Sequence, residues 1–433
     1  MTLALHIDRA LAQTVPGRAV WVALSGGLDS SLLLALAVAA CRRHPRPLYA
    51  LHVDHGLQPA AADFEHHCRR LCSQLGVPLF VERVHVDAAS GHGIEGAARK
   101  ARYMAFQQTI SAGDTLWLAQ HRDDQAETFL LAALRGSGTG GLAAMPMARE
   151  LSGIHLQRPL LKVSRAELEE VAQGMGLEWQ EDPSNAEVVF DRNYLRHRVL
   201  PQLQERWPQA TAALARSAQW MGEADSLLTE LAAEELHRLG GLPAELPLER
   251  LMLLTPSRQR LLIRFCARQL GLPTPPAARL ATLLDQLSAR QDAQVRVSWS
   301  GAEARCWRGV LWLMSDEVQS FDTALEWDGS SMLETRWGRH PLALSLPGEE
   351  PVGKLALRPR QGGESLRLPQ RGRRDLKRLL QELGVPTWRR QGIAVVWRGE
   401  LAIAALDMIE GRWLVVAEGW QSRGPWWPSA GDL

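Results

Sequence analysis

Short apolar runs alternate with helical patterns through the first 200 residues, and this alternation limits the fold more than any other feature of the chain. Four runs predict buried strands, at Ala19–Leu24, Pro47–His52, Pro78–Val86 and Thr115–Ala119. His155–Leu161 is a candidate fifth strand. Strands that alternate with helices pair in parallel and carry helices on both faces of the sheet. We therefore predict an α/β fold with a doubly wound parallel sheet.

Helical periodicity replaces this alternation after residue 208 and continues to about residue 290. Two short strand-like runs follow, at Val295–Trp299 and Arg305–Leu313. The remaining chain is mixed and ends in a distinct basic segment. We predict three domains: the doubly wound domain at 1–208, a mostly helical domain at 209–320, and a small α+β domain at 350–433.

The charge of the chain is balanced overall but uneven along its length. Lys and Arg number 49 against 48 Asp and Glu, which excludes a protein that coats nucleic acid by net charge. The stretch Lys354–Arg390, however, holds eleven basic and three acidic residues. Such a stretch suits a nucleic-acid phosphate backbone, although a solvated surface would have the same composition.

The cysteine pattern and the apolar runs favour a cytoplasmic protein. The five cysteines include no CxxC pair, which argues against a disulfide framework or a structural zinc site. Cys68 and Cys72, four residues apart on a predicted helix, are expected to pack in the core. No apolar run approaches the ~20 residues that span a bilayer, and the N-terminus lacks a signal-peptide pattern.

A glycine-rich loop follows the first predicted strand and precedes a predicted helix. In Ser25–Ser31 (SGGLDSS), Gly26 and Gly27 allow consecutive backbone N–H groups to face one ligand, and the helix N-terminus adds a positive dipole end. These features predict a phosphate cradle, in which Asp29 suits a divalent cation that bridges to the phosphates. The alternative is a glycine turn with Asp29 or Ser30 as an ordinary N-cap.

A second polar cluster follows the fourth predicted strand. Asp124, Glu127 and Thr128 lie on one face of a predicted helix, and His121 precedes them by one turn. Two carboxylates on one face suit the binding of an ammonium group or the work of a general base. The alternative is a solvated acidic first turn, which helices favour in any case.

The order strand, SGGxDS, helix resembles the pyrophosphate loop of the N-type ATP pyrophosphatases, which have a Rossmann-like fold. The stretch Gln120–Thr128 (QHRDDQAET) resembles the HHxDDQxET motif of the tRNA(Ile)-lysidine synthase family. Gln120 stands where many members have a first His, and Thr387 departs from the family's PPW pattern. Further likenesses to that family, in chain order, are Arg135–Leu142, Arg158–Leu161, Glu181–Asn185, Arg192–His197 with Pro201, Leu376–Glu382 and Val385–Trp388.

This resemblance implies a specific reaction. The O2 atom of the wobble cytidine of an isoleucine tRNA with a CAU anticodon attacks the α-phosphate of ATP, and pyrophosphate leaves. The ε-amine of free L-lysine then attacks C2 and displaces AMP, which forms lysidine. Codon reading changes from AUG to AUA, and charging changes from methionine to isoleucine.

The resemblance also assigns roles to residues. Catalysis is expected from Asp29, Arg102, His121, Asp124 and Glu127, with Asp124 and Glu127 binding lysine and Asp29 binding Mg²⁺. For Arg102, a plain surface charge is the alternative. ATP binding is expected at Ser25, Gly26, Gly27, Leu28, Asp29, Ser30, Ser31, His52 and Val53. Binding of tRNA is expected at Arg192, Arg196, Arg358, Arg360, Arg371, Arg373, Arg374 and Lys377.

Two rival functions remain open at the level of sequence. A small-molecule amidoligase of the same superfamily would need its own substrate domain or a glutaminase cysteine. A nucleotide sensor without catalysis would tolerate loss of Asp29, Asp124 or Glu127, and all three are present. The oligomeric state is not predicted, and a homodimer is left open. Five tryptophans are expected mainly in the core, with base stacking as the alternative: Trp207, Trp220, Trp388, Trp397 and Trp413.

Overall fold

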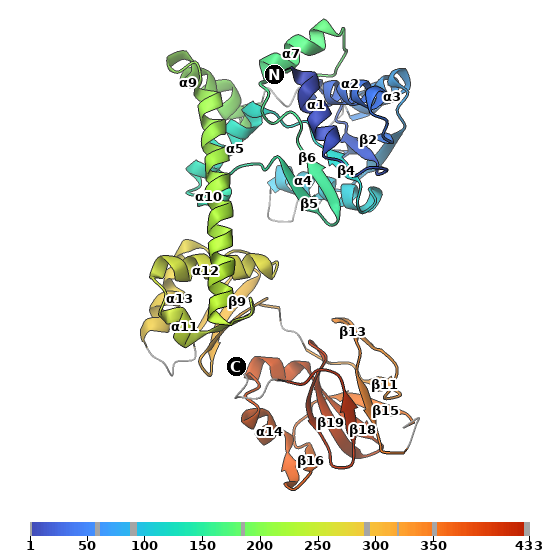
Figure 1. Cartoon of the computed structure of the whole chain (residues 1–433), viewed down its shortest axis with the longest axis vertical. Helices are drawn as coiled ribbons and strands as arrows, with labels where there is room; N and C mark the ends of the chain where they lie inside the picture. Colours follow the sequence, from blue (N-terminus) through green and yellow to red (C-terminus); the bar gives the residue numbers. More distant parts are fainter. Residues whose placement is uncertain are drawn as a thin grey trace. The chain divides into compact units, whose positions relative to one another are not determined.

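A computed structural model describes residues 2–56, 61–86, 93–182, 187–289, 295–317, 320–348 and 353–427. The chain divides into two compact units, at residues 1–227 and 228–433, and the division falls inside helix α10 (Ala210–Leu239). The predicted three-domain boundaries stay predictions. Figure 1 shows the elements of each unit along the chain.

The first unit is built on a six-stranded sheet in the order β3-β2-β1-β4-β6-β5. Five strands are parallel, and only the edge strand β5 runs antiparallel to its neighbour β6. The predicted doubly wound parallel sheet is therefore confirmed. The strands are β1 (Val20–Ala23), β2 (Leu48–Asp54), β3 (Leu79–Arg83), β4 (Thr115–Trp117), β5 (Ala148–Leu151) and β6 (Ile154–Gln157).

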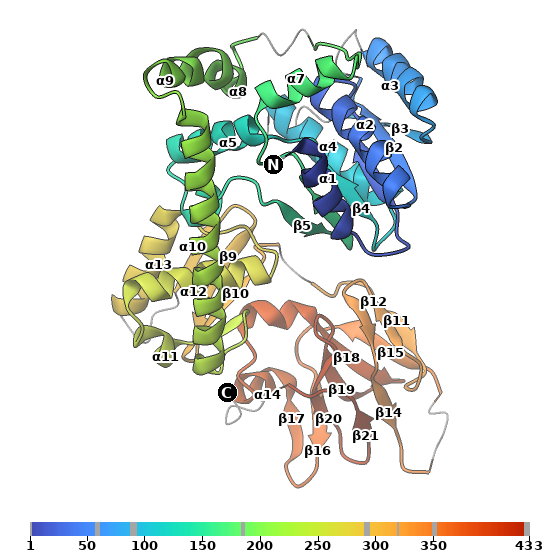
Figure 2. The same ribbon diagram turned by 45° about the horizontal axis from the view of Figure 1, so that its top comes forward.

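Helices cover both faces of this sheet because successive strand residues point to opposite sides. Val20 and Val22 of β1 pack with α1, α2, α3 and α7, whereas Trp21 faces the other side and shares a core with Phe106 and Ile110 at the end of α4. The views in Figures 1 and 2 let the reader follow α1 and α2 together along one side of the strands. The helices are α1 (Leu3–Ala12), α2 (Leu28–Arg43), α3 (Ala61–Leu75), α4 (Gly93–Thr109), α5 (Arg122–Leu134), α6 (Thr139–Leu142) and α7 (Arg165–Gly174).

The edge of the sheet differs from the sequence prediction. The candidate fifth strand is present as β6, but it is the second arm of a hairpin whose first arm, β5, was not predicted. Ser152 and Gly153 form the tight connection, and both have positive φ (48° and 83°). Two such residues match the twist of antiparallel strands, so the chain reverses here instead of crossing over.

A helix with a π-type turn connects the sheet to α10. Its parts are α8 (Asp191–Tyr194), a π turn η2 (Leu195–Val199) and α9 (Leu200–Arg206). Pro201, in the first turn of α9, has no backbone N–H to donate to the preceding turn. A wider turn at this point changes the direction in which the arginines of Arg192–Arg198 project.

The second unit begins with helices around a four-stranded antiparallel sheet in the order β7-β10-β9-β8. The predicted helical region is confirmed, but the predicted strand Arg305–Leu313 is two strands joined at Arg308 and Gly309, which have positive φ (48° and 76°). The elements are β7 (Glu245–Pro247), α11 (Leu248–Met252), α12 (Pro256–Gln269), α13 (Ala277–Ala289), β8 (Arg296–Trp299), β9 (Ala302–Trp307) and β10 (Val310–Met314).

The remainder of this unit is a five-stranded antiparallel sheet in the order β11-β15-β18-β19-β20, with three two-stranded hairpins or pairs beside it. The predicted α+β character of this region is confirmed. Its elements are β11 (Leu325–Trp327), β12 (Leu333–Thr335), β13 (Gly338–His340), β14 (Ala343–Ser345), β15 (Leu355–Pro359), β16 (Ser365–Leu368), β17 (Gly372–Asp375), α14 (Leu376–Glu382), a 3-10 helix η3 (Thr387–Gly392), β18 (Ile393–Arg398), β19 (Leu401–Asp407), β20 (Arg412–Val416) and β21 (Gln421–Arg423).

Cys68 and Cys72 are buried in the first core as predicted, and burial raises the pKa of the Cys68 thiol to about 12. None of the described helices combines the length and the apolar character that crossing a membrane requires.

Removal of one buried leucine from α2 tests the first core. Leu34 is fully buried, so we expect Leu34→Ala to lower the free energy of unfolding of the first unit by about 3 kcal/mol. Leu134→Ala is the matched control because that leucine, also helical, is 76% exposed. Urea unfolding followed by circular dichroism measures both. Equal shifts for the two variants would contradict this packing.

Candidate active site

The site lies where the order of the sheet reverses. Strand β1 pairs with β2 on one side and with β4 on the other, so the chain segments that follow β1 and β4 leave the sheet side by side. Ligand sites of open α/β sheets form in this position, at the carboxyl ends of the strands. The glycine-rich loop follows β1, and the His121–Glu127 cluster follows β4.

The loop Ser25–Ser31 is organised around the hydroxyl of Ser30. The backbone N–H groups of Ser25 and Gly26 donate to Ser30 Oγ at 3.1 and 3.2 Å, and Ser25 Oγ lies 2.9 Å from the same oxygen. Helix α2 begins at Leu28, directly after the N-cap Gly27. The turn thus gathers backbone donors, hydroxyls and a helix N-terminus at one place, as a phosphate site requires.

Gly26 is required by both conformation and space. Its φ is +90°, and a Cβ placed there would lie 3.1 Å from Phe64 Cδ1 and 3.2 Å from Cys68 Sγ. Helix α3 therefore packs directly against the turn. His52 lies beside it, with its Nδ1 2.8 Å from the carbonyl oxygen of Leu24.

His121 forms the N-cap of α5 and connects the two clusters. Its side chain accepts a hydrogen bond from the Asp123 N–H, and its own N–H donates to Asp124 Oδ2 at 3.0 Å. The imidazole Nε2 lies 3.7 Å from Asp29 Oδ2 in the loop. Burial disfavours the charged imidazole, but the carboxylates of Asp123, Asp124 and Asp29 outweigh this effect and raise the pKa of His121.

Asp124 and Glu127 are both paired with Arg196. The guanidinium of Arg196 contacts the two oxygens of Glu127 at 2.7 and 3.0 Å and Asp124 Oδ1 at 3.0 Å. Arg192 adds a contact of 3.4 Å to Glu127 and donates to Thr128 Oγ1 at 2.8 Å. Glu127 is fully buried, and burial raises its pKa although Arg196 opposes this shift.

Asp29 has one partnered and one unpartnered carboxylate oxygen. Its Oδ2 lies near His121 and 3.6 Å from Arg165, whereas Oδ1 is buried and has no hydrogen-bond partner among the described residues. Burial raises the pKa of Asp29, against the opposing influence of His121 and Arg165. A buried acceptor without a donor calls for a cation or a water.

Two side chains of the α5 region have supporting roles that the sequence analysis did not assign. Gln125 donates to the Met145 carbonyl at 2.9 Å and accepts from the Met145 N–H at 3.0 Å. This pair of bonds holds the turn that contains Ala144, whose φ is +53°. Gln120 accepts a hydrogen bond from the buried Arg158 at 3.0 Å. The only feature of the sequence that could have indicated these roles is that both glutamines lie within the QHRDDQAET motif.

Arg102 lies apart from these contacts. It projects from α4 and donates to His55 Nε2 at 3.0 Å, just after β2. Burial and the charge of Arg102 lower the pKa of His55 to about 4. Val53 is half-buried near the end of β2. Residues Pro183, Ser184 and Asn185, part of a motif in the sequence analysis, lie outside the described residues.

The predicted tRNA-binding residues divide between two places. Arg192 and Arg196 contact the buried carboxylates, as described above. The others lie in the second unit around β15 and the hairpin β16–β17, where Arg373, Arg374 and Lys377 are exposed. Arg371 pairs with Glu382 at 2.7 Å, Arg360 lies 3.9 Å from Glu364, and Arg358 stacks on Trp397 at 5.5 Å.

The prediction that the tryptophans are mainly core residues is wrong for two of them. Trp207 and Trp220 are each 59% exposed, whereas Trp413 is fully buried. Trp388 and Trp397 are half-buried. The exposed pair follows no local pattern in the sequence: Trp207 is the C-cap of α9, and Trp220 lies in α10, which also carries the buried Ala218.

Comparison with known proteins matches three family descriptions to the chain. The family description "PP-loop domain" matches residues 2–203, "TilS substrate binding domain" matches 246–312, and "TilS substrate C-terminal domain" matches 355–421. The chain is 43% identical to tRNA(Ile)-lysidine synthase of Xanthomonas axonopodis pv. citri over 92% of this chain and 91% of that protein. Identity to the enzyme of the same name from Pseudomonas aeruginosa is 44%, over 89% of each chain.

A solved structure of the U34-tRNA thiolase NcsA from Methanococcus maripaludis covers 51% of this chain and 78% of its own, with a TM-score of 0.43 and 15% identity. That likeness is too loose to support a conclusion about the site.

The sheet order, the loop after β1 and the matched domain define the first unit as a PP-loop domain of the ATP pyrophosphatase type. The protein is an ATP-using ligase. The chain belongs to the tRNA(Ile)-lysidine synthase family, since the similarity to curated members extends over nearly its whole length.

The pairing of Arg196 with the two carboxylates can be tested by stability. Arg196→Ala leaves Arg192 beside the buried Glu127 and His121 beside Asp124, and we expect it to lower the free energy of unfolding by about 2–3 kcal/mol. Arg198→Ala is the control, because Arg198 lies in the same π turn and is exposed. A loss below about 0.5 kcal/mol for Arg196→Ala would contradict the pairing.

Proposed function

We propose that this protein joins free L-lysine to C2 of the wobble cytidine of the CAU-anticodon isoleucine tRNA, through an adenylated cytidine. Family membership supports the formation of lysidine on tRNA(Ile). One observation carries the finer proposal. Two carboxylates, the buried Glu127 and the partly buried Asp124, lie next to the phosphate loop: His121 Nε2 is 3.5 Å from Asp124 Oδ2 and 3.7 Å from Asp29 Oδ2.

The first step needs groups that hold a triphosphate and stabilise a leaving pyrophosphate. The backbone donors and hydroxyls of the loop from Ser25 to Ser31 serve this purpose. Cytidine O2 forms a bond to the α-phosphorus, and the bond to the β-phosphate oxygen breaks. Arg102 is proposed to stabilise charge at the α-phosphate, and His52 and Val53 to contact the nucleoside.

The residues at the loop fit a magnesium ion that is shared with the phosphates. Mg²⁺ usually takes one or two carboxylates and completes its shell with phosphate oxygens and waters. Asp29 offers one buried oxygen without a donor, and no three His, Cys, Asp or Glu side chains of the described ranges gather as a closed metal cage. Asp29 would hold the ion, which would neutralise charge on the departing pyrophosphate.

The second step needs a site for an alkyl ammonium that then loses a proton. Asp124 and Glu127 are proposed to hold the ammonium group of lysine. Arg196, which now contacts both carboxylates, would either move away or share their oxygens with that ammonium group. The amine nitrogen forms a bond to C2, the C2–O2 bond breaks, and AMP leaves with that oxygen. One of the carboxylates or a water takes the amine proton.

The proposed consequence is a change of decoding. A wobble cytidine that carries lysine at C2 would pair with adenosine instead of guanosine, so the tRNA would read AUA instead of AUG. Charging would change from methionine to isoleucine. The basic residues of the second unit, with Arg373, Arg374 and Lys377 exposed, are proposed to contact tRNA phosphates and to position the molecule.

Isotope-labelled lysine tests the proposal. The protein is incubated with ATP, labelled lysine and an unmodified CAU transcript, and the product nucleosides are analysed by mass. We expect labelled lysidine and an equal amount of AMP, and neither with a transcript that has uridine at the wobble position. AMP formed without tRNA would favour a small-molecule amidoligase, and no AMP under any condition would favour a nucleotide sensor.

Removal of the loop carboxylate should stop the first step. Asp29→Ala is expected to abolish AMP release, since Asp29 is the only carboxylate of the Ser25–Ser31 loop. Asp63→Ala, at an exposed position of α3, is the matched control and should retain parental activity. AMP release by Asp29→Ala within about twofold of the parent would exclude this role.

Neutralisation of Glu127 should affect lysine more than ATP. Loss of one charged contact to an ammonium costs about 1.5–3 kcal/mol, so Glu127→Gln is expected to raise the KM for lysine about 10- to 100-fold. The KM for ATP should change little. Glu170→Gln, exposed on α7, is the control. An unchanged lysine dependence would remove Glu127 from the lysine pocket.

A further inference from the structure

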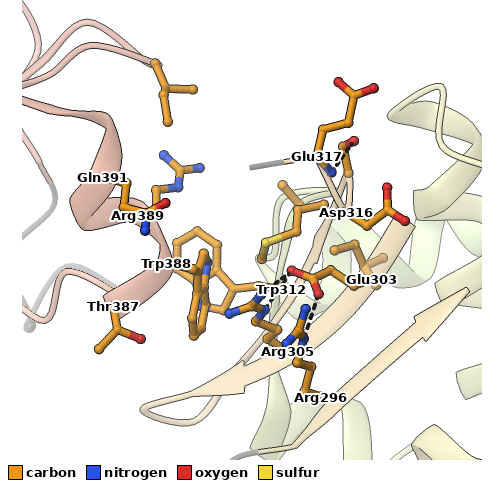
Figure 3. Close-up of a pocket in the computed structure, with 15 residues that line it drawn as sticks. Arg296, Glu303, Arg305, Trp312, Asp316, Glu317, Thr387, Trp388, Arg389 and Gln391 are labelled. Atoms are coloured by element: carbon orange, nitrogen blue, oxygen red, sulfur yellow. Dashed lines mark hydrogen bonds and ion pairs between the residues drawn. The ribbon is translucent and has the colours of Figure 1, made fainter. Parts of the chain in front are cut away.

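A cavity of about 420 Å³ lies within the second unit, remote in sequence from the residues of the active site. Its volume is in the range that binds small molecules and single nucleotides. Figure 3 shows its two walls: strand residues Arg296, Glu303 and Arg305 on one side, and Thr387 and Gln391 of η3 on the other. Trp388 lies between the walls.

Two indole N–H groups of this cavity are buried donors without acceptors. Nε1 of Trp312 and Nε1 of Trp388 have no hydrogen-bond partner among the residues that the structure describes. Trp312 is only 5% exposed, and the two rings meet edge to face at 6.4 Å. Buried Trp N–H groups nearly always have an acceptor, so these two point to a ligand that supplies carbonyl oxygens or ring nitrogens.

The inner charged groups of the cavity, Glu303, Arg296, Arg305 and Arg389, are all paired within the unit. Both oxygens of the buried Glu303 are occupied, by Arg305 at 2.6 Å and Arg296 at 2.9 Å. Arg389 pairs with Asp407 at 3.3 Å and lies over the ring of Trp312 at 5.4 Å. The walls therefore favour an uncharged group over an anion or a cation.

The remaining surface is aromatic, with two carboxylates at the rim. Arg305 stacks on Trp388 at 4.9 Å, which fixes the orientation of that ring. Asp316 and Glu317 are exposed lining residues that can accept from an amino or imino group. The inner indole N–H groups and the rim carboxylates can hydrogen-bond to the edge of a nucleobase, and the aromatic rings can stack on its face.

We propose that this cavity binds the base of one unpaired nucleotide of the tRNA, a nucleotide other than the wobble cytidine. This inference rests on the proposed function, which requires the wobble cytidine at Asp29 and Asp124 of the first unit. An RNA ligand is favoured over a peptide because a nucleobase offers both a flat face and a hydrogen-bonding edge, and the same unit exposes Arg373, Arg374 and Lys377 for phosphates.

A double-mutant cycle between protein and tRNA tests the proposal. Thr387→Trp fills the cavity from an exposed position, and Trp312→Phe removes one buried donor but keeps a ring. Each variant of the full chain is assayed for lysidine formation with intact tRNA and with transcripts that lack one base at each unpaired position outside the anticodon in turn. We expect each variant to raise the KM for intact tRNA about 5- to 10-fold with kcat unchanged.

The coupling identifies the bound nucleotide. One abasic transcript should raise the KM of the parent about 10-fold but raise that of Thr387→Trp no further, whereas the other transcripts should act independently. Trp337→Phe, a half-buried tryptophan of the same unit outside the cavity, is the control and should match the parent.

Independent effects at every position, or an unchanged KM for both variants, would overturn the proposal. If the parent forms no lysidine on intact tRNA, the proposed function fails instead, so the two failures are distinguishable.

Discussion

Parallel pairing of β1 with both β2 and β4 is the constraint on which the active site depends. The chain leaves β1 toward one side of the sheet and leaves β4 toward the other, so the space between their carboxyl ends is not crossed by either connection. The phosphate loop and the start of α5 border that space. The loop begins two residues after β1 and α5 begins five residues after β4, so the backbone of the sheet sets their positions.

The same arrangement brings several carboxylates together in a largely buried site, and their negative charge has to be balanced by neighbouring side chains. Asp29, Asp124 and Glu127 lie close enough to interact, and Glu127 is fully buried. Three side chains contact these carboxylates: His121 at the N-cap of α5, Arg165 at the start of α7, and Arg196 in the π turn. Unpaired, these carboxylates would be protonated or would destabilise the unit. The paired cluster instead keeps acidic groups available beside the phosphate loop.

Much of the fold could be predicted because its signals are local. Four apolar runs become β1 to β4. The strand predictions failed where one pattern of residues is compatible with two different structures. The run Arg305–Leu313 keeps its alternation across a two-residue turn, so two antiparallel strands resemble one. In the site, Asp124 and Glu127 were correctly placed on one helix face, but the sequence contains no sign that Arg192 and Arg196 would meet them.

The sequence by itself determined the class of sheet, the phosphate loop and the spacing of the carboxylates, because each depends on residues within a few positions of one another. Only the tertiary structure decided which cations neutralise those carboxylates, since Arg196 and Asp124 are 72 positions apart. The cavity around Trp312 and Trp388 was likewise decided by packing, as its walls come from β8–β10 and η3. Contacts between distant segments depend on how whole elements pack, and no short pattern of residue types records that outcome.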